Sequence, residues 1–107
     1  KFEDSKQVIF FREFLKKQNA KNIVFITLDE INKDYLQKLI DFLIKDNSFN
    51  TKINLISSKY NLEDCKNADF TILFSSLNFS LSSEIKDLRN RMDLLEIYLK
   101  GFILIDQ

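Results

Sequence analysis

The sequence predicts an α/β domain, a three-layer sandwich in which about four parallel strands carry helices on both faces. Two observations point to this fold class. Short apolar, β-branched runs alternate with longer segments whose apolar residues recur every three or four positions. The short runs are almost continuously apolar, which is typical of parallel strands that are buried on both faces. Right-handed crossovers then favour the strand order 2-1-3-4.

The first half of the chain predicts two helices and two strands. Residues 5–17 have apolar side chains at helical spacing and two lysines in the last turn, where cations suit the helix dipole. Residues 22–27 form a run too short for a helix, which fits a buried strand. A second helix is expected at about residues 33–46. Turn-forming residues then lead to a second strand at residues 52–58.

The second half predicts a single helical turn, a third strand at residues 69–76, a long helix and a fourth strand at residues 102–106. The long helix begins at Ser80 or Ser82 and runs to about Lys100. Its apolar residues follow spacings of three and four: Ile85, Leu88, Met92, Leu95 and Leu99. Gly101 is expected to end this helix as a C′ glycine. The first two helices should cover one face of the sheet, and the last helix and the short turn the other.

Length and composition bound the class of protein. The 107 residues fit a single domain, residues 1–107, and 45% of them are apolar, which is enough for one packed core. The chain lacks an initiating Met and stops directly after an apolar strand, so we expect a fragment of a longer protein. Sixteen basic residues balance sixteen acidic ones and are interspersed with them, which argues against a nucleic-acid partner. No apolar run reaches the roughly 18 residues needed to span a membrane. We therefore expect a cytoplasmic domain, whose parent protein could be anchored in the inner membrane.

Two features of the composition exclude common catalytic chemistry. The chain has no histidine, which rules out a Ser–His–Asp triad and a Cys–His pair within this chain. It has one cysteine, Cys65, so it can form neither an internal disulfide nor a cysteine zinc site. Sugar-phosphotransfer IIB domains carry a nucleophilic cysteine directly after the first strand, whereas Cys65 lies between acidic residues that raise a thiol pKa. We expect Cys65 to fill space in the core.

Polar residues gather where the predicted strands end, which is the edge where open parallel sheets bind ligands. They are Thr27, Asp29, Ser57, Ser58, Lys59, Ser75, Ser76 and Asp106. Hydroxyls, Lys59 and a helix N-terminus could hold a phosphate there. The interpretation that we favour is that these residues are the caps and turn formers that any such fold needs.

The turn after the first strand, "TLDEINKDY", lacks the features of a phosphate-binding loop. It contains Lys33 but no glycine and no Ser or Thr after that lysine, and Asp29 and Glu30 would repel an anion. A receiver-type Mg²⁺ site is excluded as well, because the third strand ends in serines and lies between Asp29 and Asp106. We therefore expect no catalytic residue, no cofactor and no metal.

The last predicted helix carries three apolar residues off its core-facing stripe: Leu94, Ile97 and Tyr98. Two interpretations remain open. They could pack on a neighbouring loop or on parts of a longer parent chain, or they could form a surface for a protein partner or for self-association.

Two stretches resemble the cytoplasmic domain of bacterial polysaccharide tyrosine kinases, which are relatives of MinD-type P-loop ATPases. "VIFFREFLKKQNAKNIVFIT" has a Phe-Arg pair, Phe11-Arg12, on the helix before the first strand. In "ADFTILFSSLNFSLSSEIKDLRNRMDLLEIYLKGFILID", Ala68-Asp69 precedes an apolar strand and Gly101 precedes the last one. Because the phosphate loop is absent, the resemblance implies a degenerate domain without ATP binding or kinase activity.

The function expected from this resemblance is a non-catalytic assembly or regulatory module in bacterial capsule or exopolysaccharide biosynthesis or export. Such domains are fused to, or paired with, a membrane chain-length determinant. The alternative is a small-molecule or phosphoryl-handling domain of receiver or sugar-phosphotransfer IIB layout, which would use the hydroxyl-rich strand ends.

Overall fold

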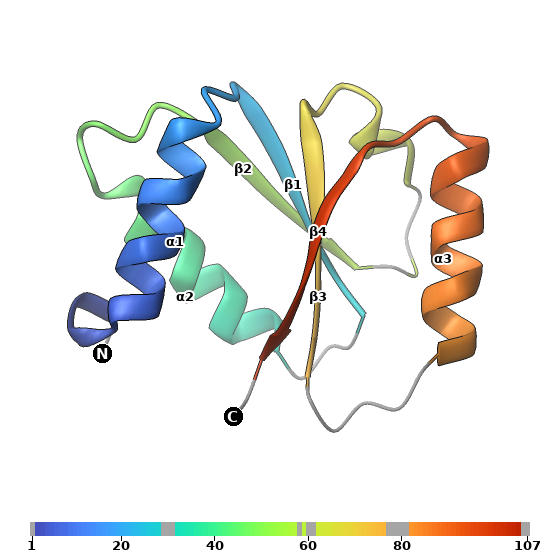
Figure 1. Cartoon of the computed structure of the whole chain (residues 1–107), viewed down its shortest axis with the longest axis horizontal. Coiled ribbons are helices and arrows are strands. Elements are labelled where there is room, and N and C mark those ends of the chain that lie inside the picture. Colours follow the sequence, from blue (N-terminus) through green and yellow to red (C-terminus); the bar gives the residue numbers. More distant parts are fainter. Residues whose placement is uncertain (1, 29–31, 58, 60–61, 77–81, 106–107) are drawn as a thin grey trace.

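The fold is built on one parallel sheet of four strands, as predicted (Figure 1). The computed structural model describes residues 2–28, 32–57, 59, 62–76 and 82–105. Within these residues the sheet has the order β2-β1-β3-β4. The strands are β1 (Asn22–Thr27), β2 (Lys52–Ser57), β3 (Phe70–Ser76) and β4 (Leu99–Ile105).

Helices cover both faces of the sheet and complete the predicted three-layer sandwich. In Figure 1, α1 (Lys6–Lys17) and α2 (Lys33–Ile44) lie on one side of the strands and α3 (Ser82–Leu94) lies on the other. Two short 3₁₀ helices accompany them, η1 (Phe2–Asp4) and η2 (Leu62–Cys65). The turn predicted before β3 is therefore η2.

The core has two halves, separated by the sheet. The half under α1 and α2 is rich in aromatic rings: Phe25 and Phe74 lie 4.7 Å apart between ring centroids, and Phe11 of α1 contacts both. The half under α3 is aliphatic and includes Leu88 and Met92 of that helix. Because β1 and β3 are apolar on both faces, they lie in the centre of the sheet.

A charged cluster joins α1 to the end of α2. The Lys16 Nζ lies 2.8 Å from a carboxylate oxygen of Asp46, and the Arg12 Nε lies 3.3 Å from the same oxygen. The Arg12 guanidinium also lies over the ring of Phe42, 5.4 Å from its centroid. The hydrogen bond from Lys16 and those from Ser48 hold the pKa of Asp46 well below its ordinary value. Arg12 of the Phe-Arg pair therefore joins α1 to α2, while Phe11 packs on the sheet.

The predicted end of the last helix is wrong. The helix ends at Leu94, and Glu96 follows with a positive φ of 58°. The Glu96 N–H donates to the carbonyl of Asp93 at 3.2 Å, and the Ile97 N–H donates to that of Met92 at 2.9 Å. This is the hydrogen-bond pattern of a Schellman helix end, with Glu96 in the place where glycine is usual.

Gly101 therefore caps no helix. It lies inside β4, directly after a register shift in the pairing with β3. Thr71 pairs with Leu99 and Ile72 pairs with Gly101, so Lys100 is the extra residue of a β-bulge.

None of the helices in the described parts of the chain is long and apolar enough to cross a membrane.

Candidate functional site

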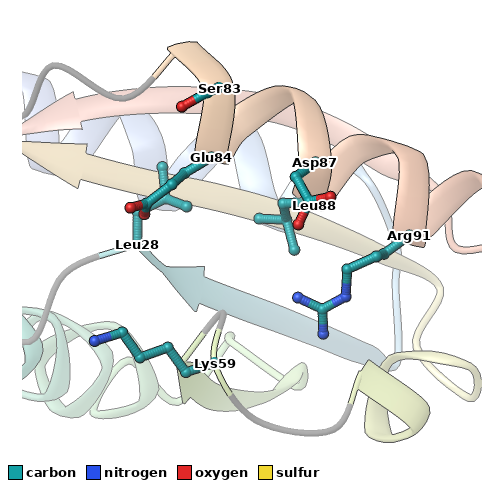
Figure 2. Close-up of a pocket in the computed structure, with 7 residues that line it drawn as sticks. All are labelled: Leu28, Lys59, Ser83, Glu84, Asp87, Leu88 and Arg91. Atoms are coloured by element: carbon teal, nitrogen blue, oxygen red, sulfur yellow. The ribbon is translucent and has the colours of Figure 1, made fainter.

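The edge of the sheet expected to bind ligands contains an open cleft of about 430 Å³ (Figure 2). It lies beside the carboxyl end of β1, between Lys59 after β2 and the first turns of α3. The strand order reverses between β1 and β3, which is where such sheets place their binding crevices. The lining residues are Leu28, Lys59, Ser83, Glu84, Asp87, Leu88 and Arg91.

The charges in this cleft are mixed. Glu84, Asp87 and Arg91 follow one another on one face of α3 at spacings of three and four residues. Figure 2 shows Lys59 on the opposite side of the cleft, while the buried Leu28 and Leu88 lie between the two walls. Two carboxylates offset the two cations, so the cleft lacks the positive charge that would attract a phosphate.

The hydroxyl groups at the strand ends are used within the fold. The side chains of Thr27, Ser57 and Ser75 are buried. The Ser57 Oγ accepts a hydrogen bond of 3.3 Å from the backbone N–H of Lys59, and the Ser75 hydroxyl donates to the Ser76 carbonyl at 3.3 Å. This arrangement supports the interpretation of Ser57 and Ser75 as turn formers.

Lys33, from the turn after β1, does not line the cleft. It is exposed at the first position of α2. Asp29, Glu30, Ser58, Ser80 and Asp106 lie outside the described residues.

Cys65 is a buried residue of the aliphatic core half, as expected. Burial raises the pKa of its thiol to about 11, and the charge of Asp64 adds to the increase. A thiol that keeps its proton at neutral pH is a poor nucleophile. Among the described residues, no three His, Cys, Asp or Glu side chains are placed to hold a metal ion.

Asp69, from the Ala-Asp pair of the resemblance, lies at the opposite end of the sheet from the cleft. One oxygen of its carboxylate accepts hydrogen bonds from the backbone N–H groups of Lys21 at 2.7 Å and Asn22 at 3.0 Å. These bonds lower the pKa of Asp69. Its role is to tie the start of β3 to the start of β1.

The three predicted surface residues do not form one surface, which corrects the prediction. Leu94 and Tyr98 are 84% and 62% exposed, but Ile97 is buried in the core beside Met92. The reason is the early helix end: the turn at Glu96 directs Ile97 inward, to the place where a Schellman motif brings an apolar residue against the helix.

A second apolar surface was not predicted from the sequence. Phe10 and Phe14 of α1 are 67% and 38% exposed, and Phe102 and Leu104 of β4 are 40% and 52% exposed. We call these four residues, with Gly101, the β4 surface. The run "FILI" is apolar at every position, so the sequence does not show which of its side chains are left exposed, although alternate residues of a strand face opposite sides.

No protein-family model matches the chain, and no curated protein or solved structure is significantly similar to it. The class of protein follows from the topology of the parallel sheet: this is a Rossmann-like α/β domain. The resemblance to polysaccharide tyrosine kinases stays a prediction.

Proposed function

We propose that this chain is a non-catalytic assembly or regulatory domain that acts by binding another protein. One observation carries the proposal: large apolar side chains are exposed on α1, on β4 and after α3. Exposed apolar groups of this size mark protein interaction surfaces when they lie together.

The chemistry of the residues supports a role without catalysis. The chain has no histidine, and its single thiol is buried and protonated at neutral pH. The cleft at the sheet edge places Glu84 and Asp87 where an anionic substrate would bind. The setting that we propose, bacterial capsule or exopolysaccharide biosynthesis or export, rests on the resemblance of the Phe11-Arg12 and Ala68-Asp69 segments.

The test is thermal unfolding of the purified chain with ATP–Mg²⁺, ADP and sugar phosphates. A ligand that binds only the folded state stabilises it by about 2.7 kcal/mol at 100 times its Kd. We expect no change in Tm with any of these compounds. A concentration-dependent rise with one of them would contradict the proposal.

A second function is favoured by Lys59 and Arg91, which reach the cleft at the reversal of strand order. If the domain handles a small phosphorylated or carboxylated molecule, the compound should raise Tm in the native chain. The rise should be lost in Lys59→Glu, because that change replaces an exposed cation of the cleft with an acid. Ile44→Lys, a change at an exposed residue of α2 that does not line the cleft, should keep the rise.

A further inference from the structure

Among the residues that the structure describes, β4 ends the sheet and has no strand on its outer edge. Its pairing partner there is β3, and in Figure 1 it is drawn in front of β3 with no helix across it. The unpaired backbone groups of an edge strand are a template for another strand. Natural edge strands are usually protected by charges or by a cover, but the described part of β4 has Lys100 as its one charged residue.

Apolar side chains flank this edge on the α3 side of the sheet. Phe102 and Leu104 alternate with the inward Ile103 and Ile105, which pack in the core half under α1. Phe102 and Leu104 therefore face the other way and are about half exposed.

A second pair of apolar side chains flanks the edge on the α1 side. Phe10 and Phe14 lie on the opposite side of α1 from Arg12 and Lys16, which contact the end of α2. Gln7 shares their side of the helix, and the groove that it lines contains Ile103 and Leu104 of β4 as well as Tyr35 and Leu39 of α2. The exposed rings of α1 therefore lie on the side of this helix away from its contacts with the end of α2.

Gly101 leaves open space at this edge of the sheet. It has no positive φ, and a Cβ added to it would meet no atom within 4 Å. A glycine inside a strand often marks a β-bulge, such as the one at Lys100, or the close approach of another backbone. The space at Gly101 is compatible with the approach of a second strand to β4.

We infer that the β4 surface binds a second copy of this chain, through antiparallel pairing of β4 with β4 around a twofold axis at Ile103. This inference rests on the proposed function and names the partner. The paired sheets form one continuous sheet of eight strands. A closed dimer of this kind uses the same surface on both copies.

The side chains suit this symmetry. An axis at Ile103 places Phe102 of each copy opposite Leu104 of the other, which gives two apolar cross-strand pairs. It separates the Lys100 residues of the two copies by six positions, or about 20 Å, so they do not repel strongly. Because a twofold axis perpendicular to the sheet keeps each face on its own side, Phe10 and Phe14 meet their equivalents on the second α1.

The size and charge of the surface are adequate for a dimer. The molecule measures 36 × 30 × 18 Å and its shortest axis runs across the strands, so the β4 side is one of its two broad faces (Figure 1). A face of this size accommodates the roughly 800 Å² per partner of a standard interface. The chain has a formal net charge of zero, so two copies have no long-range repulsion to overcome.

The test is sedimentation equilibrium of the native chain and of charged variants over a range of concentrations. We expect a dimer whose Kd rises at least about tenfold in Leu104→Lys and in Phe10→Lys, because each change buries charge in the interface. Ile44→Lys is the matched control, since Ile44 is an equally exposed apolar residue on α2. Its dimer should be unchanged.

Gly101→Val keeps the test decisive if the lysine variants unfold. The open space at Gly101 admits a side chain in the single chain, so the monomer should fold with unchanged or higher Tm. The dimer should weaken, because the added side chain obstructs the approach of the second copy. An equally strong dimer in Gly101→Val and Leu104→Lys would overturn the inference.

The outcomes separate this inference from the proposed function. A native chain that is monomeric at every concentration overturns self-association, while the ligand panel still decides whether the domain binds small molecules. A dimer that is lost in Leu94→Glu but kept in Leu104→Lys would place the interface at the end of α3 and overturn the β4 assignment.

Discussion

The two edge strands of the sheet face the solvent with different side chains. β2 has Lys52 and Asn54 at its exposed positions, whereas β4 has Lys100 followed by the large apolar residues Phe102 and Leu104. Both strands occupy the same topological position at an edge of the sheet, with one neighbouring strand each among the described residues. Protein edges that stay in water carry charged or polar residues. The difference indicates that β2 is built to stay exposed and β4 to be covered.

The largest expected effect comes from destabilising the segment that leads from α3 into β4. Ile97→Ala removes a buried side chain that packs against α3, so we expect it to lower the free energy of unfolding by about 2–4 kcal/mol. Leu94→Ala, three residues earlier and highly exposed, should change it by less than about 0.5 kcal/mol. Urea unfolding of both variants measures the difference. Equal effects would show that Ile97 is not in the core.

The second prediction concerns the exposed side chains of β2, which are made apolar like those of β4. Lys52→Ile with Asn54→Leu places two apolar residues at the exposed positions of that edge. In a chain that already carries Leu104→Lys, we expect these two changes to lower the Kd of self-association about tenfold. Sedimentation equilibrium measures this Kd. A double change without any effect would mean that exposed apolar residues alone do not decide which edge associates.

The smallest expected effect concerns acid stability on the side of the molecule away from β4. The folded state lowers the pKa of Asp46 below its ordinary value of 3.8, chiefly through the hydrogen bond from Lys16. The resulting stability is present above pH 3.8 and is lost as the pH falls further and Asp46 takes up its proton. Asp46→Asn should therefore lose less stability on acidification than the native chain, as followed by thermal unfolding between pH 6 and pH 2, a range set by the ordinary carboxyl pKa.

Asp69→Asn is the control for this measurement. It removes the contribution of a different carboxylate, which accepts two backbone hydrogen bonds at the other end of the sheet. It should keep the part of the acid response that belongs to Asp46. An unchanged response in Asp46→Asn would contradict the assignment to the cluster between α1 and α2.

The sheet and its layers could be predicted because the spacing of apolar residues along the chain distinguishes buried strands from amphipathic helices. β1 and β3 are continuous apolar runs, and the helices carry residues at spacings of three and four. The end of α3 was not predictable from the same rule. Leu95 and Leu99 continue the helical spacing past the real end at Leu94, and Glu96 takes a backbone conformation that usually belongs to glycine.

The candidate site was predicted less well than the fold. The burial of Cys65 and the local use of the Ser57 and Ser75 hydroxyls agree with the sequence, because residue type and position in the fold decide them. The cleft walls on α3 and the β4 surface depend on which side of each element is left uncovered. That property is set by the packing of distant elements, and no local pattern contains it.

Amide hydrogen exchange at low and high protein concentration tests the central claim, that β4 is the covered edge and β2 the open one. We predict that the β4 amides which point away from β3 become more protected as concentration rises, while β2 amides exchange at the same rate throughout. Protection that rises in β2, or that rises in neither strand, would contradict the account.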